Sequence, residues 1–328
     1  MDNILLLDVS VGSLNKGDNI IMKCIEDELD FFCKDKFVLN LPTHVSAFHS
    51  YQVYRNSYRV QLYNNCTSKF VCGSNLLVKD LFTHFPQWNI NLFNYKPLKG
   101  SILVGVGAGS GSKSNIYTKN LYRKLLNNNM YHSVRDERSK NFVEELGLKA
   151  INTGCPTMWK LTPEHCKDIP KRKSNSVVFT LTKCQKEDER DQVLIDTLVE
   201  KYNKVYYWVQ GIDDLDYLNK FKNIEHIKIV NPSLAKYEEI LEMDDLDYVG
   251  TRLHAGIYAM RYKKRSIIIA IDERAREINK SNNLNCIEKD QIHEIGNFID
   301  SEFETNIKLP LTEINKWKNQ FVKRIKEE

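Results

Sequence analysis

The chain has 328 residues, of which 42% are hydrophobic and 27% charged, a composition typical of a globular protein and not of a disordered one. Its formal net charge of +4 is too small to indicate nucleic acid, but it is compatible with anionic small molecules or a membrane surface. The 8 cysteines form no CxxC pair, which argues against zinc and against a disulfide framework. Since we find neither a signal peptide nor an apolar run long enough to span a membrane, we expect a cytoplasmic protein with reduced thiols.

Short apolar runs alternate with helical patterns along the first half of the chain. Strands are predicted at 4–9, 37–41, 70–72, 101–106, 130–134 and 150–153, and helices at 17–29, 76–82 and 136–146. Residues 44–65 are rich in Tyr and have no period, so we expect a loop or short helices whose aromatic rings stack on sugars or cover the sheet. The glycine run 105–111 does not match G-x-G-x-x-G, which argues against a dinucleotide site and leaves a turn over a ligand or a plain turn.

The second half repeats the alternation after a proline-containing segment, 156–175, that we interpret as an interdomain linker. Strands are predicted at 176–181, 204–209, 227–230, 246–250 and 266–271, and helices at 187–201, 215–221, 234–243, 255–260 and 273–279. This pattern predicts an α/β protein with two doubly wound Rossmann-like domains, 1–155 and 176–309, facing each other across a cleft, followed by a C-terminal helix, 310–328. Ligands of such sheets bind outside the carboxyl ends of the strands, so the cleft is the expected site.

The stretch 248–262, YVGTRLHAGIYAMRY, concentrates groups that suit an anion and a proton transfer. A short apolar approach ends at Gly250, and Thr251, Arg252 and His254 precede or open a helix. A helix N-terminus presents unpaired N–H groups and a partial positive charge, and Arg252 adds a fork of donors that fits carboxylate or phosphate. His254 adds the one type of side chain whose unperturbed pKa suits proton transfer near neutral pH. The alternative is a helix cap with a buried histidine and a structural arginine, and the spacing alone leaves both open.

Three further stretches accompany this one: Asn15-Lys16-Gly17-Asp18, Val134-Arg135-Asp136-Glu137-Arg138-Ser139 and Asn152-Thr153-Gly154-Cys155-Pro156. Together with GTRLHAGIYA, the apolar strand after it and Asp272, they resemble the polysaccharide pyruvyl transferase family in the same order, over residues 3–278. The resemblance implies a two-domain fold like that of GT-B glycosyltransferases. It also implies transfer of pyruvate, as a ketal, from phosphoenolpyruvate to a sugar diol.

That reaction assigns expected roles to the motif residues. It requires neither a redox cofactor nor a metal, but it needs cations for the donor and a group that moves protons. We expect the catalytic residues to be His254 as acid/base, Arg252, Arg135 and Asp18. The donor anion would lie against Gly250, Thr251, Arg252 and Arg135, and the acceptor or cleft residues would be Asn15, Gly17, Asn152 and Asp272.

Each assignment has a structural alternative. Arg252 either binds the donor or pairs with Asp245 or Asp247. Asp18 either accepts a hydroxyl proton or stabilises a helix start, and Asp272 either orients His254 or caps a helix. For the residues outside these roles, we expect Asp136 to cap the following helix and Cys155 to be a packing residue, and no metal-ligand spacing is found among the other histidines.

The expected partners are phosphoenolpyruvate and a nucleotide- or lipid-linked sugar of an exopolysaccharide, capsule or other cell-envelope glycan. The alternative functions are a GT-B glycosyltransferase with a nucleotide-sugar donor, in which the same basic loop binds a diphosphate, and a non-catalytic sugar-binding protein. The C-terminal segment places Ile314, Trp317, Phe321 and Ile325 on one stripe among basic residues. This helix either packs on the protein, which we favour, or makes peripheral contact with an anionic inner membrane.

Overall fold

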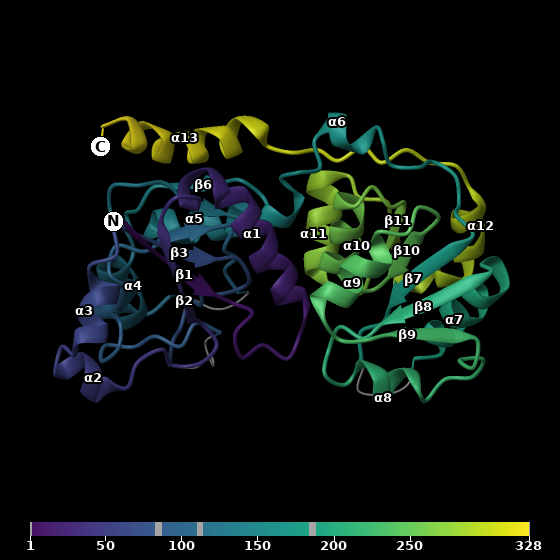
Figure 1. Ribbon diagram of the computed structural model, residues 1–328, viewed down its shortest axis with the longest axis horizontal. Helices are drawn as coiled ribbons and strands as arrows, with labels where there is room; N and C mark the ends of the chain where they lie inside the picture. The colour runs from purple at the N-terminus through teal and green to yellow at the C-terminus, as the bar shows by residue number, and fades with distance from the viewer. Residues whose placement is uncertain (1, 83–86, 110–113, 184–187, 328) are drawn as a thin grey trace. The chain divides into compact units, whose positions relative to one another are not determined.

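The computed structural model describes residues 2–82, 87–109, 114–183 and 188–327, with side chains described up to residue 322. The chain forms two compact units (Figure 1). Unit 1 contains Met1–Ser13, Ile21–Trp159 and Pro310–Glu328, and unit 2 contains Leu14–Ile20 and Lys160–Leu309. The short segment Leu14–Ile20 therefore leaves the N-terminal unit and joins the other one, which the sequence did not predict.

Unit 1 is built on parallel strands, as expected from nearly continuous apolar runs. One sheet has the order β2-β1-β3-β4, and the parallel pair β5-β6 lies beside β4, joined through a bridge between Val106 and Val134. The strands are β1 (Asn3–Asp8), β2 (Phe37–Pro42), β3 (Ser68–Cys72), β4 (Ile102–Val104), β5 (His132–Val134) and β6 (Ala150–Asn152). All six match predicted strands to within three residues at either end.

The helices of unit 1 follow the strands in alternation, with two departures from expectation. They are α1 (Gly17–Cys33), α2 (Ser50–Tyr54), α3 (Tyr58–Asn64), η1 (Lys96–Leu98), α4 (Ile116–Leu125), α5 (Glu137–Glu145), η2 (Pro156–Met158) and α13 (Leu311–Glu327). The predicted helix 76–82 is wrong, because none of these residues is helical. Leu77 instead forms a parallel bridge with Ala108. Its N–H donates to the Gly107 carbonyl at 3.1 Å and its carbonyl accepts from the Gly109 N–H at 2.9 Å, so Leu77 is extended backbone paired with the glycine-rich segment. Helix α4, capped by Asn115, was not predicted.

Unit 2 contains one six-stranded parallel sheet in the order β12-β11-β10-β7-β8-β9. Counted along the unit, this is the order 3-2-1-4-5-6 of Rossmann folds, and the strand order reverses between β7 and β10. The strands are β7 (Ser176–Thr180), β8 (Lys204–Trp208), β9 (Ile227–Val230), β10 (Asp247–Gly250), β11 (Ser266–Ala270) and β12 (Cys286–Glu288). In folds with this strand order, ligands bind beyond the carboxyl ends of the strands at the reversal point.

The helices of unit 2 cover this sheet (Figure 1). They are α6 (Pro163–Cys166), α7 (Glu189–Lys201), α8 (Asp214–Leu218), α9 (Leu234–Leu241), α10 (Leu253–Arg261), α11 (Glu273–Asn282), η3 (Lys289–Glu294) and α12 (Ile295–Asp300). Residue 187, where α7 was expected to begin, lies outside the described residues. The core contains Val177 and Phe179 of β7, Leu194 and Leu198 of α7, and Val249 of β10, all fully buried.

The segment 156–175, which we interpreted from the sequence as an interdomain linker, contains the boundary between the two units. The unit boundary falls after Trp159, and Trp159, Leu161 and Ile169 are buried. Two of its prolines stand in the first turns of η2 and α6, where the fixed φ of proline favours helix initiation. These two prolines therefore mark helix starts within the segment.

Helix α13 packs on unit 1 through the stripe predicted from the sequence (Figure 1). Ile314, Trp317 and Phe321 are buried, and the Trp317 indole donates to the Tyr131 carbonyl at 2.9 Å. The Ile325 side chain lies outside the described residues. The three described members of the apolar stripe are therefore used in packing. Among the described residues, no helix is long and apolar enough to cross a bilayer.

Candidate functional site

Strands β7 and β10 meet at the reversal point of the unit 2 sheet with no space between their ends. Gly250 is paired with Thr180, and a Cβ built on Gly250 would lie 2.6 Å from the Thr180 hydroxyl and 2.7 Å from its carbonyl oxygen. Only glycine fits there. The Thr180 hydroxyl also bonds the Tyr248 hydroxyl at 2.6 Å, and the next loop residues continue the contact through Thr182 and Thr251 hydroxyls 2.9 Å apart.

Arg252 is fixed beyond the carboxyl end of β10 by two partners from neighbouring loops. Its Nε donates to the Leu181 carbonyl at 3.0 Å, and its Nη2 pairs with Asp214 Oδ1 at 2.5 Å. Among the described residues these bonds use two of the five guanidinium N–H groups, and the side chain is 15% exposed. Arg252 therefore keeps donors for an anion while its position is set by the protein.

Asp214 holds the arginine from the first residue of α8, beyond β8. Its carboxylate also accepts the Gly211 N–H at 2.7 Å, and its side chain is 1% exposed. A Cβ on Gly211 would lie 2.7 Å from Arg252 Nη2, so a larger residue would push the guanidinium away. Both oxygens of the carboxylate are thus used, one to fix the loop and one to fix Arg252.

The alternative in which Arg252 pairs with Asp245 or Asp247 is wrong, because both aspartates have other partners. Asp247 pairs with Arg265 at 3.0 Å, with both side chains fully buried, and Asp245 accepts from Asn175. Both aspartates lie at the amino end of β10 or before it, whereas Arg252 follows its carboxyl end. A strand rises by about 3.3 Å per residue, so Arg252 and these aspartates lie at opposite ends of strand β10.

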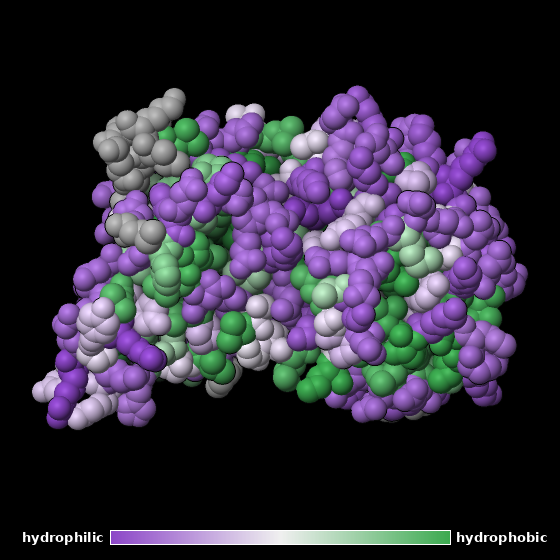
Figure 2. Space-filling view, in the orientation of Figure 1, coloured by the Kyte–Doolittle hydropathy of each residue, from purple (hydrophilic) through white to green (hydrophobic). Residues whose placement is uncertain are grey.

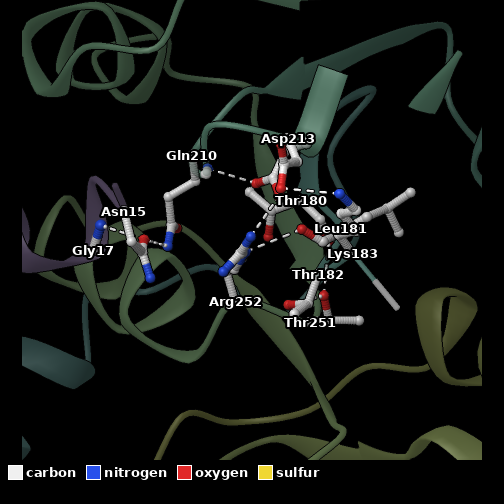
Figure 3. A network of polar contacts seen from close by, with 12 residues as sticks. Asn15, Gly17, Thr180, Leu181, Thr182, Lys183, Gln210, Asp213, Thr251 and Arg252 are labelled. Atoms are coloured by element: carbon white, nitrogen blue, oxygen red, sulfur yellow. Dashed lines mark hydrogen bonds and ion pairs between the residues drawn. The ribbon is translucent and has the colours of Figure 1, made fainter. Parts of the chain in front are cut away.

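The N-terminal motif reaches the same loop of unit 2. The Asn15 side-chain oxygen accepts from the Gly17 N–H at 2.8 Å and from Gln210 Nε2 at 2.7 Å. The Lys16 N–H donates to the Gln210 carbonyl at 2.9 Å, and Asn15 forms an antiparallel bridge with Gly211. Figure 3 shows Arg252 between the Asn15–Gln210 pair and the Thr182–Thr251 pair. Two motifs from distant parts of the sequence are therefore joined by residues 210–214.

Asp18 stands in the first turn of α1, where its backbone N–H donates to the Asn15 carbonyl at 3.1 Å and its side chain is half-buried. An acidic residue there is favourable for the helix dipole. This placement agrees with the alternative in which Asp18 stabilises the start of the helix. Asp18 also lies within three residues of Asn15 and Gly17 in the sequence.

His254 lies in helix α10, every residue of which is buried. The histidine is 8% exposed, at the second helical position after Arg252. A Cβ on Gly256 would lie 2.7 Å from the Tyr248 ring, so the helix sits directly against β10. The Tyr237 hydroxyl additionally donates to the Ala255 carbonyl at 2.9 Å. The first turn of α10, and with it the backbone of His254, is held rigidly next to the carboxyl end of β10.

Asp272 caps helix α11. Its carboxylate accepts from the Ala275 N–H at 2.8 Å, with the dihedral angles of a helix N-cap. This is the structural alternative expected for Asp272. The residue follows β11, which lies next to β10 in the sheet.

Arg135 and Asn152 belong to unit 1 and follow β5 and β6. The Arg135 side chain is 6% exposed and pairs with Asp136 at 3.3 Å. Asp136 caps α5 as expected, accepting from the Ser139 N–H at 2.7 Å. Asn152 bonds Glu137 at 2.9 Å and accepts from the Gly154 N–H at 3.1 Å, so both ends of its amide hold the local backbone.

The glycine run and Cys155 also have packing explanations in unit 1. A Cβ on Gly107 would lie 2.5 Å from Arg135 Nε, and one on Gly105 would overlap the Pro156 ring. Cys155 is buried with its sulfur 3.1 Å from the Thr157 hydroxyl. Gly111 lies outside the described residues. In the parts of the chain that the structure covers, no cluster of three or more His, Cys, Asp or Glu side chains is placed to hold a metal.

The family is decided by comparison with known sequences. The profile of the polysaccharide pyruvyl transferase family matches residues 15–273, which include the Asn15 motif, the Arg252 motif and Asp272. The chain belongs to this family. The polysaccharide pyruvyl transferases are transferases, so the chain is an enzyme of that class. No curated protein sequence matches the chain.

Comparison with solved structures places this pyruvyl transferase family member in the GT-B type of fold. UDP-GlcNAc 2-epimerase of Methanocaldococcus jannaschii, in complex with UDP-GlcNAc and UDP, matches with a TM-score of 0.55 and 12% identity over 100% of both chains. The S. aureus MnaA–UDP structure matches at 0.55 and 9%, over 99% of this chain and 97% of that one. Anabaena Alr3699/HepE, with UDP and glucose, matches at 0.52 and 11%, over 100% and 99%. The likeness confirms the predicted fold class.

Sequence reasoning missed the residues that join the two motifs, chiefly Gln210, Asp214 and the Leu181 carbonyl. The available signal was positional: β7 and β8 are adjacent central strands, and residues just beyond their carboxyl ends belong at the site. The Gln210-Gly211 pair directly after β8 carries that signal.

Proposed function

We propose that this pyruvyl transferase family member transfers the pyruvyl unit of phosphoenolpyruvate to two hydroxyls of one sugar in a surface-glycan precursor, forming a ketal and releasing phosphate. The placement of Arg252 carries the proposal. A guanidinium that is fixed by Asp214 at the reversal point of a Rossmann sheet, beside a helix N-terminus, is preorganised for a ligand with phosphate and carboxylate groups.

The reaction balances without oxidation or reduction. The oxygen of one sugar hydroxyl bonds to C2 of the donor while the C3 methylene gains a proton. The bond between C2 and the phosphate oxygen then breaks, and the oxygen of the second hydroxyl bonds to C2. Two hydroxyl protons are lost, of which one balances the proton gained by C3 and the other leaves with phosphate. Neither a metal nor a redox cofactor is required by these steps.

His254 is the proposed acid/base for these proton transfers. It lies two residues after Arg252, on a helix that cannot shift without displacing Tyr248, so the donor anion and the imidazole would meet within one turn. Positioned acid/base groups contribute about 10²–10⁴-fold to rate. Arg252 and the N–H groups of the first turn of α10 would stabilise charge on the departing phosphate.

The acceptor sugar is proposed to lie against the Asn15 motif and Gln210. The Gln210 amide must direct its N–H toward Asn15, because the Asn15 oxygen already accepts from the Gly17 N–H. The Gln210 Oε1 atom is left buried without a hydrogen-bond partner among the described residues. An unpaired buried acceptor is costly, and a sugar hydroxyl would satisfy it. Asp18 lies in the same segment as a carboxylate that can accept a hydroxyl proton.

Calorimetric titration distinguishes this function from glycosyl transfer. Phosphoenolpyruvate and a panel of UDP-sugars are titrated into the wild type, Arg252→Gln and Arg276→Gln. Arg276 is a matched control, because it lies in the same unit but pairs with Glu288 on the surface. We expect phosphoenolpyruvate to bind, with affinity reduced at least about 10-fold by Arg252→Gln, since a lost charged contact costs about 2–5 kcal/mol, and unchanged by Arg276→Gln. Binding of UDP-sugars without phosphoenolpyruvate would establish a glycosyltransferase instead.

The role of His254 is tested by phosphate release from phosphoenolpyruvate with a panel of nucleotide- and lipid-linked sugars. His254→Gln should keep the melting temperature and donor affinity but lose about 10²–10⁴-fold in turnover. An unfolded variant would assign His254 a packing role, and a fully active one would remove it from the mechanism. Arg135→Ala in the same assay tests whether the buried arginine of unit 1 contributes to donor binding.

A further inference from the structure

The charge of the chain is unevenly distributed along the sequence. Between residues 36 and 135 there are twelve lysines and arginines but a single acidic residue, Asp80. The net charge of +4 therefore conceals a basic stretch that is balanced by acids elsewhere. Asp80 is itself engaged locally, since its carboxylate accepts from Asn115 and from the Phe82 N–H. This stretch builds β2, α2, α3, β3, β4 and α4 of unit 1, so this unit has a surface suited to anions.

Exposed aromatic side chains gather within the basic stretch. We name the aromatic–basic patch as Tyr51, Tyr54, Arg55, Leu92, Phe93 and Lys96. Tyr54 is 88% exposed and Phe93 72%. Five of the six members line one hollow of about 330 Å³, and the Arg55 guanidinium lies 4.8 Å from the centre of the Tyr51 ring. No acidic side chain lines this hollow.

The patch is not explained by packing within unit 1. Helix α2 is anchored by one buried residue, Val53, and by a capping box between His49 and Gln52. Its tyrosines point outward, and Figure 2 shows pale and deep-purple side chains together at the corner where Figure 1 places α2. Contiguous exposed aromatic and apolar groups with a polar rim mark interaction surfaces. A second hollow of about 470 Å³ shares Ser50 and Phe93 with the first and is lined by hydroxyl, imidazole and amide groups.

We propose that the aromatic–basic patch docks unit 1 on the surface of an anionic phospholipid bilayer. Tyrosine and phenylalanine rings that protrude, as Tyr54 and Phe93 do, are suited to the headgroup region, and arginine and lysine beside them neutralise anionic lipids. The polar hollow next to the patch has groups that can bond a headgroup. In helix α13, for which the sequence left membrane contact as an alternative, Ile314, Trp317 and Phe321 are buried.

The protruding rings favour a bilayer over a soluble acidic glycan. A glycan is held by rings and polar groups that enclose it, whereas Tyr54 and Phe93 are mostly exposed and the hollow between them is lined by one amine and mainly apolar atoms. Membrane docking also favours a lipid-linked over a nucleotide-linked acceptor, and in that respect the inference rests on the proposed function.

Flotation of the full chain with vesicles tests the docking in the absence of donor and acceptor. Vesicles of 30% phosphatidylglycerol in phosphatidylcholine are compared with pure phosphatidylcholine, at low and high salt. We expect binding to the anionic vesicles only, weakened by salt. Arg55→Glu with Lys96→Glu should reduce partitioning at least about 25-fold, since each basic residue contributes about fivefold. Tyr54→Ser with Phe93→Ser should also reduce it, and circular dichroism checks the fold of each variant.

Matched controls come from the exposed edge of unit 2. Lys228→Glu and Ile229→Ser, on the edge strand β9, should leave vesicle binding unchanged. The proposal is overturned if the wild type does not bind anionic vesicles, or if the two patch variants bind as well as the wild type. It is also overturned, in favour of an acidic glycan, if the patch variants lose affinity for heparin while no protein binds vesicles. Phosphoenolpyruvate affinity, measured separately, reports on the proposed function whatever the vesicle result.

Discussion

The pair between Asp214 and Arg252 provides a quantitative test of how the candidate site is assembled. We consider the substitutions Asp214→Asn and Arg252→Gln and the double variant. Asparagine keeps an oxygen for the Gly211 N–H but removes the charge that faces the guanidinium. Removing one partner of a fully buried pair costs about 3–5 kcal/mol, because the other charge is left without compensation. Asp214 is 1% exposed, but Arg252 is 15% exposed and can turn partly toward water, so we expect about 2–3 kcal/mol for Asp214→Asn.

The double variant removes both charges and should cost less than the sum of the two single changes. We expect a coupling free energy of about 1.5–2 kcal/mol, well above the roughly 0.3–0.5 kcal/mol by which independent sites deviate from additivity. The surface pair between Arg276 and Glu288, 2.9 Å apart with both side chains more than 40% exposed, is the control. Its coupling should fall within about 0.2–1 kcal/mol.

The assay is urea unfolding monitored by hydrogen exchange of peptides from β7, β8 and β10. This local probe is needed because the two units need not unfold in one step. The same variants are titrated with phosphoenolpyruvate. If Asp214 positions Arg252 for the donor, Asp214→Asn should weaken donor binding although the arginine is still present. A coupling below about 0.5 kcal/mol would refute the claim that this pair holds the candidate site in place. Donor affinity unchanged in Asp214→Asn would refute its positioning role.

Three further predictions concern stability. Gly250→Ala should lower the melting temperature of unit 2 or prevent its folding, because the new Cβ would lie within 2.8 Å of three Thr180 atoms, and a wild-type melting temperature would contradict this. Burial lowers the pKa of His132 to about 4, so between pH 6.5 and 4 the unfolded chain binds a proton that the folded chain does not. The free energy of unfolding should therefore fall by about 3 kcal/mol as the pH is lowered through this window. In His132→Gln this part of the fall should be missing when urea midpoints are compared. Trp317→Ala should destabilise unit 1 by about 3–5 kcal/mol in urea unfolding, because it removes a fully buried ring and one of the donors to the Tyr131 carbonyl. A loss below about 1 kcal/mol would show that the packing of α13 contributes little to stability.

The sequence predicted the fold class because the strands are short, apolar and regularly separated by helical patterns. It failed where tertiary pairing overrode local preference. Leu76 and Leu77 belong to a run that favours helix, yet the backbone of Leu77 is paired with residues 107–109. Strand β12 and helix α12 at the end of unit 2 were also not predicted, since β12 has three residues and too little pattern to detect.

The candidate site was predicted in its motifs but not in its connections. Glycine before Thr251 and Arg252 predicted a close strand-to-helix turn, and the structure gives its reason in the backbone of Thr180. The partner of Arg252 could not be predicted, because Asp213, Asp214 and Asp216 are equivalent in a linear sequence. Which of them faces the arginine depends on where β8 ends relative to β7, and that register is a property of the folded sheet.

The joining of the Asn15 and Arg252 motifs follows from the topology of unit 2 rather than from either motif. In the order 3-2-1-4-5-6, the loops after β7 and β8 and after β10 all open at one edge of the sheet. The loop after β8 lies next to the reversal point and contacts both motifs. Gln210 of this loop bonds Asn15, and Asp214 at its end pairs with Arg252. Gly211 between them pairs its backbone with Asn15 and leaves room for the guanidinium. A segment from the start of the chain is thereby coupled to the arginine through five consecutive residues, and any change that shifts Gln210 must also shift Asp214.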